Sequence, residues 1–137
     1  MPQPALIRNN DGFTLVELMV AVIIVAVGMF GVLQSINMSL QYNLKNELRN
    51  EGIRVGEKYM ADLRGKTFDL LSTPGYTSFV EVGKVRGGAK NYVVERAVQN
   101  LAYNGLQPST KQLTITVKWS YRNMTTVNRV VSVVARP

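Results

Sequence analysis

The sequence predicts an α+β fold in which a long N-terminal α-helix packs against a C-terminal antiparallel β-sheet. Three observations support this fold class. Residues 13–33 form an apolar run, a helical period continues without proline to residue 64, and apolar and polar residues alternate in the last third. Helices and strands segregated along the chain in this way are typical of α+β domains.

The apolar run is long enough to cross a membrane as a helix. From Phe13 to Leu33 it contains a single ionisable side chain, that of Glu17. At about 1.5 Å rise per residue the run spans about 31 Å, which is the hydrocarbon thickness of a bilayer. We therefore expect residues 13–33 to be a transmembrane helix segment.

Glu17 is the residue of this run that needs an explanation. A carboxylate costs roughly 2.5–3.5 kcal/mol at the bilayer centre, less near one end, and there it still requires a partner. Leucine would serve a simple anchor better, so the sequence indicates a specific role for Glu17.

After Leu33 the composition becomes polar while the helical period persists. Apolar residues recur every four positions from residue 36 to 48 and again at residues 59 and 63, and Gly65 is a plausible C-cap. We therefore expect an amphipathic helix over residues 34–64, continuous with the apolar half. Gly52 and Gly56 lie inside it and allow two interpretations, weak positions in the helix or sites of close approach by the sheet.

The remainder of the chain predicts a loop over residues 65–91 and an antiparallel sheet over residues 92–136. Within the loop, Thr73–Tyr76 and Arg86–Lys90 contain turn residues, and Ser78–Val85 is a candidate short strand. Three strands are expected in the sheet, over residues 92–101, 113–121 and 126–135, because Val-rich or alternating segments are separated by turn residues. Trp119 is expected in the core.

Composition argues against catalysis. The chain has 137 residues with no Cys and no His, which removes disulfides, thiolate metal sites and the commonest general base. Phosphate-loop and metal-ligand spacings are also lacking in the sequence. We therefore expect a protein that is not an enzyme and needs no cofactor or metal.

The net charge of +7 raises a second hypothesis, a binding module for polyanions such as DNA. An excess of basic over acidic residues follows Gly65. The alternatives are a solvated face or a surface complementary to an acidic neighbour. The basic residues concerned are Lys84, Arg86, Lys90, Arg96, Lys111, Lys118, Arg122, Arg129 and Arg136.

The N-terminal pattern resembles the processing signal of the type IV pilin superfamily. A short polar leader ends in Gly12, Phe13 follows, then Thr-Leu-Val-Glu and a long apolar helix. The resemblance implies a pilin fold and a leader over residues 1–12. It implies that a prepilin peptidase cuts between Gly12 and Phe13 and that Phe13 is N-methylated. By the same resemblance, Glu17 is used in packing one subunit against the next.

Within that family the stretch from Ala26 to Gln34 is most similar to PilV-type minor pilins, which modify the pilus. The implied protein is a minor pilin whose residues 13–33 lie in the inner membrane and later in the filament core. Its soluble domain, residues 34–137, is expected in the periplasm. A type II secretion pseudopilin and a DNA-binding minor pilin of a DNA-uptake system are the alternatives, and its partners would be other pilin or pseudopilin subunits.

Overall fold

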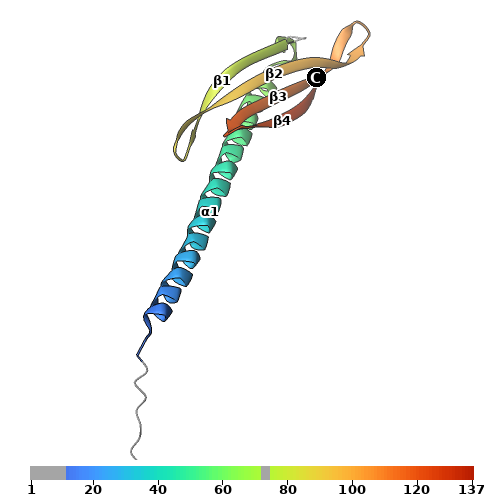
Figure 1. Ribbon diagram of the computed structural model, residues 1–137. Coiled ribbons are helices and arrows are strands. Elements are labelled where there is room, and N and C mark those ends of the chain that lie inside the picture. Colours follow the sequence, from blue (N-terminus) through green and yellow to red (C-terminus); the bar gives the residue numbers. More distant parts are fainter. Residues whose placement is uncertain (1–11, 72–74) are drawn as a thin grey trace, which may run out of the picture. The chain divides into compact units, whose positions relative to one another are not determined.

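The structure is a computed structural model that describes residues 12–71 and 75–137. Most of the expected leader, residues 1–11, and the first part of the expected turn at Thr73–Tyr76 lie outside the described residues. The elements are α1 (Leu15–Arg64), the 3₁₀ turn η1 (Phe68–Leu70), and strands β1 (Gly75–Val85), β2 (Gly88–Asn104), β3 (Gln107–Tyr121) and β4 (Met124–Ala135) (Figure 1).

Helix α1 has the predicted extent and is continuous for 50 residues. The chain divides into two units, residues 1–40 and 41–137, and α1 contributes to both. At its end the Gly65 amide donates to the Ala61 carbonyl at 2.9 Å, so the last turn is closed by backbone hydrogen bonding. The residues with positive φ do not include Gly65, so this glycine ends the helix without the left-handed cap conformation.

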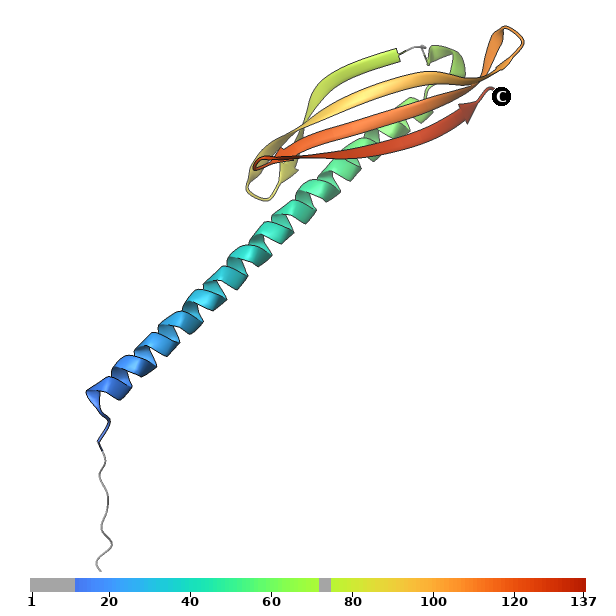
Figure 2. The same ribbon diagram turned by 45° about the vertical axis from the view of Figure 1, so that its right-hand side comes forward.

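The four strands form one antiparallel sheet in the order β1-β2-β3-β4 (Figure 1). Each strand pairs with the next along the chain through a short turn. Gly87 in the β1–β2 turn, Gly88 at the start of β2 and Gly105 in the β2–β3 turn adopt positive φ values of 101°, 135° and 61°. The predicted pilin-like α+β architecture is therefore confirmed, with the C-terminal part of α1 lying across one face of the sheet (Figure 2).

The prediction of a loop over residues 65–91 was wrong, except that the candidate strand Ser78–Val85 within it lies inside β1. This segment contains η1, all of β1 and the start of β2, so the sheet begins at Gly75 rather than at residue 92. Strand β1 pairs with β2 along its whole length, from Gly75 opposite Val98 to Val85 opposite Gly88. Its helix-facing positions include Glu81 and Gly83, which masks the alternating pattern that reveals a strand in sequence.

The core lies between α1 and the inner face of the sheet. Trp119 is only 5% exposed, which confirms its expected place in the core. Its ring is tilted against Tyr92 with centroids 5.8 Å apart. The other buried apolar side chains of this cluster come from both layers and are Leu48, Val55, Met60, Leu63, Leu71, Val94, Val98, Leu113, Ile115 and Val117.

The two glycines of the second half of α1 are sites of close approach. A Cβ added to Gly52 would lie 2.7 Å from Cζ3 of Trp119, and one added to Gly56 would lie 3.3 Å from Cγ2 of Val130. Gly52 and Gly56 are therefore sites where the sheet approaches the helix closely, rather than merely weak positions in the helix. Trp119 packs directly on the helix backbone because Gly52 has no side chain.

A polar network closes the β1 edge of the same interface. The Arg96 guanidinium lies against the rings of both Tyr59 and Phe79, 4.6 and 4.8 Å from their centroids, and these two rings pack edge to face. Tyr59 and Lys58 both donate hydrogen bonds to the Glu81 carboxylate. The hydrogen bond from Lys58, followed by that from Tyr59, lowers the pKa of Glu81 below its usual value. These contacts hold β1 to the helix although few apolar groups are available there.

The substitution Gly52→Ala should destabilise the soluble domain. Overpacking against Trp119 costs about 1–3 kcal/mol, whereas the gain in helix propensity is only about 1 kcal/mol. Thermal unfolding of the full chain in detergent measures the difference. Gly28→Ala is the matched control, because no atom lies within 4 Å of its added Cβ and only the propensity gain applies. Equal midpoints for the two variants would contradict the packing described above.

Candidate processing and assembly segment

The start of α1 is fixed by a local capping arrangement at Thr14. The Thr14 Oγ1 accepts a hydrogen bond from the Glu17 amide at 3.2 Å, and the Thr14 carbonyl accepts one from the Leu18 amide at 3.2 Å. Thr14 is thus the N-cap, and Glu17 stands at the third helical position. The sequence Thr-x-x-Glu is the pattern of a capping box.

Glu17 therefore has a favourable local environment before any partner is considered. Its carboxylate lies in the first turn of α1. The positive end of the helix dipole favours a negative charge there by about 0.3–1 kcal/mol. This contribution is smaller than the cost of an unpaired carboxylate deep in hydrocarbon. Capping and the helix dipole explain why glutamate is tolerated at this position. They do not offset the full cost of the carboxylate in apolar surroundings, which a cationic partner would reduce.

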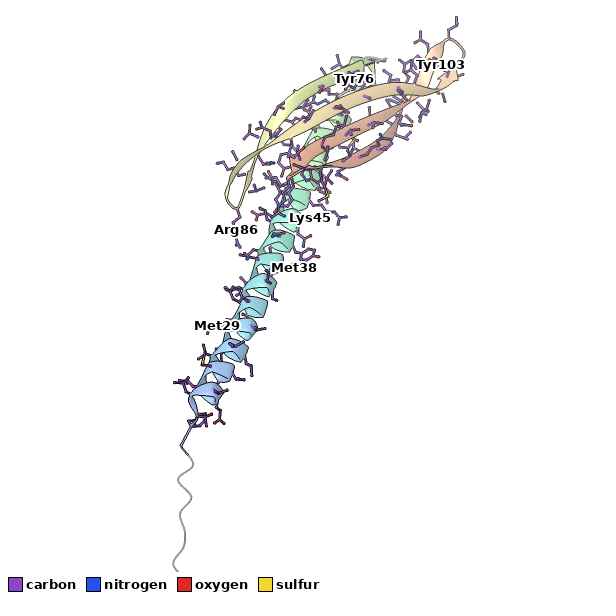
Figure 3. All side chains as sticks on the ribbon, viewed as in Figure 1. Met29, Met38, Lys45, Tyr76, Arg86 and Tyr103 are labelled. Atoms are coloured by element: carbon purple, nitrogen blue, oxygen red, sulfur yellow. The ribbon has the colours of Figure 1, made fainter. Side chains whose placement is uncertain are left out.

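The apolar half of α1 is exposed around its whole circumference. Every described residue of the N-terminal unit, from Gly12 to Leu40, is exposed, including those of the apolar run. This helix is long and apolar enough to cross a membrane. Met29 and Met38 are two of the side chains that project from it in Figure 3. A surface this apolar requires lipid or other helices around it.

The expected processing residues lie just before the helix. Gly12 and Phe13 precede the first helical residue, Leu15, and they belong to no regular element. The Phe13 side chain is 81% exposed. The bond between Gly12 and Phe13 is therefore outside the helical hydrogen-bond ladder and is accessible along the backbone. A protease needs both properties at the bond that it cuts.

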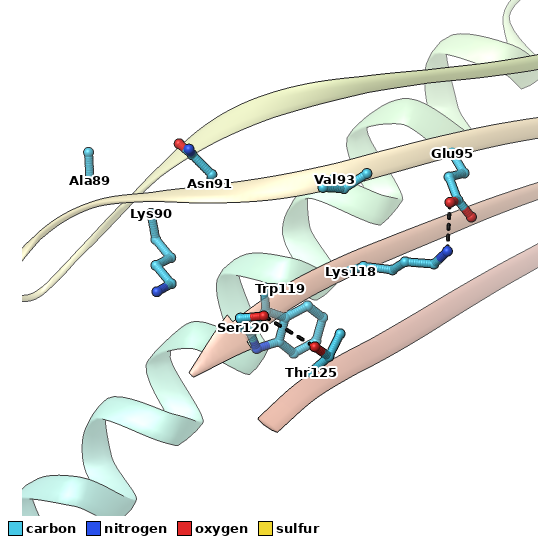
Figure 4. Close-up of a pocket in the computed structure, with 9 residues that line it drawn as sticks. All are labelled: Ala89, Lys90, Asn91, Val93, Glu95, Lys118, Trp119, Ser120 and Thr125. Atoms are coloured by element: carbon cyan, nitrogen blue, oxygen red, sulfur yellow. Dashed lines mark hydrogen bonds and ion pairs between the residues drawn. The ribbon is translucent and has the colours of Figure 1, made fainter. Parts of the chain in front are cut away.

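The second unit, residues 41–137, contains an open depression of about 670 Å³ on the sheet (Figure 4). Three charged residues line it, and two of them pair, because the Lys118 ammonium donates to Glu95 Oε1 at 2.6 Å, while Lys90 is the third. That hydrogen bond holds the pKa of Glu95 below its usual value. Ser120 and Thr125 hydroxyls lie 3.2 Å apart at the other side. Among the described residues no group of three or more acidic, His or Cys side chains could hold a metal ion.

The basic residues do not form one free surface. Lys118, Arg96 and Arg136 make ion pairs with Glu95, Asp62 and Asp69 respectively. Arg86 lies at the β1–β2 turn (Figure 3), where its amide donates to the Glu47 carboxylate at 2.6 Å. Three of the nine basic side chains therefore have an acidic partner within the fold, whereas the Arg86 contact involves its backbone amide and not its guanidinium.

Lys111 is a structural residue rather than part of a basic surface, which corrects the sequence-based expectation. It is 5% exposed, and its ammonium donates to the carbonyls of Phe68 at 2.8 Å and Leu71 at 2.6 Å. It thereby ties η1 to β3. The sequence carries a signal that was not used, because the alternation of β3 places Lys111 on the same face as the buried Leu113 and Ile115.

Thr14 was not among the site residues predicted from the sequence, although the sequence contains the pattern of an N-cap. A threonine followed three residues later by glutamate, immediately before an apolar helix, predicts an N-cap. The structure thus assigns Thr14 and Glu17 to one local unit, with Gly12 and Phe13 directly before it.

Comparison with known proteins identifies the N-terminal segment. A family model described as the prokaryotic N-terminal methylation motif matches residues 7–33. The match covers Gly12, Phe13, Glu17 and the whole apolar run, and it supports a type IV pilin-like or pseudopilin-like protein. No curated protein and no solved structure matches the chain.

The substitution Lys111→Met should destabilise the soluble domain by about 1–3 kcal/mol, because two buried carbonyls lose their donor. Methionine has an unbranched side chain of similar length that cannot donate a hydrogen bond. The change in the free energy of unfolding therefore reports the loss of the ammonium and its two hydrogen bonds. Denaturant unfolding of the full chain in detergent measures it. The control is Lys84→Met in β1, which should change the free energy of unfolding by less than about 0.5 kcal/mol. Equal effects of the two substitutions would show that Lys111 is not a structural residue.

Proposed function

We propose that the protein is a minor type IV pilin, a structural subunit inserted in the inner membrane and then assembled into a pilus. The observation that carries the proposal is the methylation motif over residues 7–33, joined to a fully exposed apolar helix with a single carboxylate. Such a helix fits membrane anchoring before assembly and a bundle of like helices afterwards. The soluble domain is then in the periplasm and later on the filament.

Processing supplies the cation that Glu17 lacks within the apolar run. Prepilin peptidase is the proposed enzyme, cutting between Gly12 and Phe13 and methylating the new amine of Phe13. A secondary amine formed in this way remains protonated at neutral pH and so carries a positive charge. The mature chain therefore begins with a cation and carries an anion four residues later.

Assembly follows from pairing these two charges between subunits. When α1 of an incoming subunit enters the apolar bundle, its Glu17 meets the amine of Phe13 on a neighbour. Each charge offsets the cost of burying the other, and removing one partner of a buried pair typically costs about 3–5 kcal/mol. The pair also selects register, since apolar helices alone could slide along one another.

The choice of minor pilin over pseudopilin rests on resemblance. The stretch Ala26–Gln34 and the Trp-containing strand followed by a Val-rich final strand are most like PilV-type proteins. The sequence also contains no Cys, so it cannot form the disulfide that closes a C-terminal loop in many major pilins. A type II secretion pseudopilin shares the same N-terminal signal and is the alternative function.

Substitutions at Glu17 and Thr14 separate charge pairing from helix capping. We expect Glu17→Ala and Glu17→Gln to leave cleavage and membrane insertion intact but to stop incorporation into filaments. A loss of about 3 kcal/mol corresponds to a more than hundredfold decrease in docking. Immunoblotting of sheared filaments and of membranes measures incorporation and insertion separately.

Thr14→Ala is the matched control. It removes the N-cap, at a cost of about 0.5–2 kcal/mol, but keeps the carboxylate. Incorporation should therefore be largely retained. Normal incorporation of Glu17→Gln would refute charge pairing, since glutamine keeps the capping pattern and lacks only the charge.

A further inference from the structure

The second unit, residues 41–137, begins at the end of the sheet that holds two of the turns. The β1–β2 and β3–β4 turns share this end because consecutive strands are antiparallel. In the first turn the Arg86 amide donates to Glu47 of α1 at 2.6 Å, and nearby the Tyr92 hydroxyl donates to the Leu48 carbonyl at 3.1 Å. We call the part formed by residues 41–49, 84–90 and 121–124 the entry end.

The basic residues of the entry end lack acidic partners among the described residues. Salt bridges within the described chain use other basic residues, namely Arg54, Lys58, Lys66, Arg96, Lys118 and Arg136. At the entry end five basic side chains are exposed and that of Lys90 is half-buried. Figure 3 shows Lys45 on α1 and Arg86 on the β1–β2 turn at this end. The basic residues of the entry end are Lys45, Arg49, Lys84, Arg86, Lys90 and Arg122.

Most of the net positive charge of the chain is therefore concentrated at the entry end. It has six basic residues and one acidic residue, Glu47, so its net charge is +5 of the +7 of the whole chain. Lys45 and Arg49 are four residues apart on α1, a spacing at which like charges destabilise a helix. An anionic partner would offset this repulsion.

Arg122 supplies one of these charges from an unfavourable backbone position. It is the non-glycine residue with positive φ, 53°, in the part of the chain that the structure describes. Glycine adopts this conformation without strain, whereas a side chain makes it unfavourable. The Arg122 guanidinium lies 5.7 Å from the centroid of the Tyr121 ring and forms no salt bridge with a described residue. The turn itself thus gives no reason for an arginine, and a partner outside the fold would.

Chain length brings the entry end close to a bilayer surface. In the proposed function residues 13–33 span the hydrocarbon, and only residues 34–40 separate that span from the second unit. These residues belong to α1 and extend about 10 Å, whereas the headgroup region on one side of a bilayer is roughly 5–8 Å deep. The second unit therefore begins within about one Debye length, ~8 Å at physiological ionic strength, of the lipid headgroups.

We propose that the entry end binds the anionic headgroups of phospholipids such as phosphatidylglycerol while the helix is inserted in the membrane. This inference deepens the proposed function and rests on it, since that function places residues 13–33 in the bilayer. Each basic residue close to an anionic leaflet strengthens binding roughly fivefold. The contact belongs to the inserted subunit, because it is lost when the helix leaves lipid.

Native mass spectrometry of the full chain, produced in cells with an active prepilin peptidase, tests the lipid contact. The protein is ejected from neutral detergent micelles that hold equal amounts of phosphatidylglycerol and phosphatidylcholine. We expect phosphatidylglycerol adducts to be at least fivefold more abundant than phosphatidylcholine adducts. A triple variant with Lys84→Gln, Arg86→Gln and Arg122→Gln should bring this ratio close to one.

The matched control carries Lys66→Gln, Arg129→Gln and Arg136→Gln, which remove the same charge away from the entry end. Its lipid ratio should stay that of the natural chain. A ratio close to one for the natural chain, or an equal decrease in both triple variants, would overturn the inference. A natural chain that binds both lipids equally but binds a short DNA duplex would show that nucleic acid, and not the membrane, is the partner.

Arg122→Gly separates lipid binding from folding. It removes both the charge and the backbone strain, so we expect the lipid ratio to fall at least twofold while the midpoint of thermal unfolding stays equal or rises. A lower midpoint would show that Arg122 stabilises the turn and would overturn its assignment to lipid.

The same spectra distinguish failure of this inference from failure of the proposed function, because the mass of the chain shows whether the leader was removed. A preference for phosphatidylglycerol in an uncleaved chain would keep the lipid contact and reject the pilin pathway. A mature chain methylated at Phe13 that lacks the preference would do the reverse.

Discussion

The structure depends first on an apolar helix surface that one chain cannot bury. The residues from Phe13 to Leu33 are exposed on all sides of α1, and Glu17 is the single ionisable group among them. Such a surface is stable only in lipid or among other helices. The same segment can therefore serve as an anchor and as an assembly element. In the proposed function, the Glu17 carboxylate pairs with a cation when the helix leaves lipid for a bundle of helices.

A second constraint governs the other half of the helix, which must hold a small sheet without disulfides. Trp119 packs on the backbone at Gly52, and Lys111 ties η1 to β3 through two carbonyls. The Tyr59–Glu81 contact secures the β1 edge. These contacts join the sheet to the second half of α1 without any disulfide.

The helix predicted over residues 13–64 begins two residues before α1 and ends at the same residue, because an uninterrupted helical period leaves little freedom. Sequence reasoning also found the three C-terminal strands and the core position of Trp119. Of β1 it gave only the candidate strand Ser78–Val85 inside a loop, since Glu81 and Gly83 occupy helix-facing positions that only a tertiary contact explains. The alternation of β3 places Lys111 on the buried face, but its acceptors, the carbonyls of Phe68 and Leu71, come from a distant segment and could not be predicted. The processing and assembly residues Gly12, Phe13 and Glu17 could be named from the sequence because they form one short local pattern, and their roles stay predictions.

The most direct test of the central claim is mass spectrometry of the mature protein extracted from membranes of cells with an active prepilin peptidase. The account predicts a chain that begins at Phe13 and carries one added methyl group on its amine. In cells without the peptidase the leader should remain. An intact leader in both strains, or a cut after the apolar run, would contradict the account, since Glu17 would then lack the proposed cation.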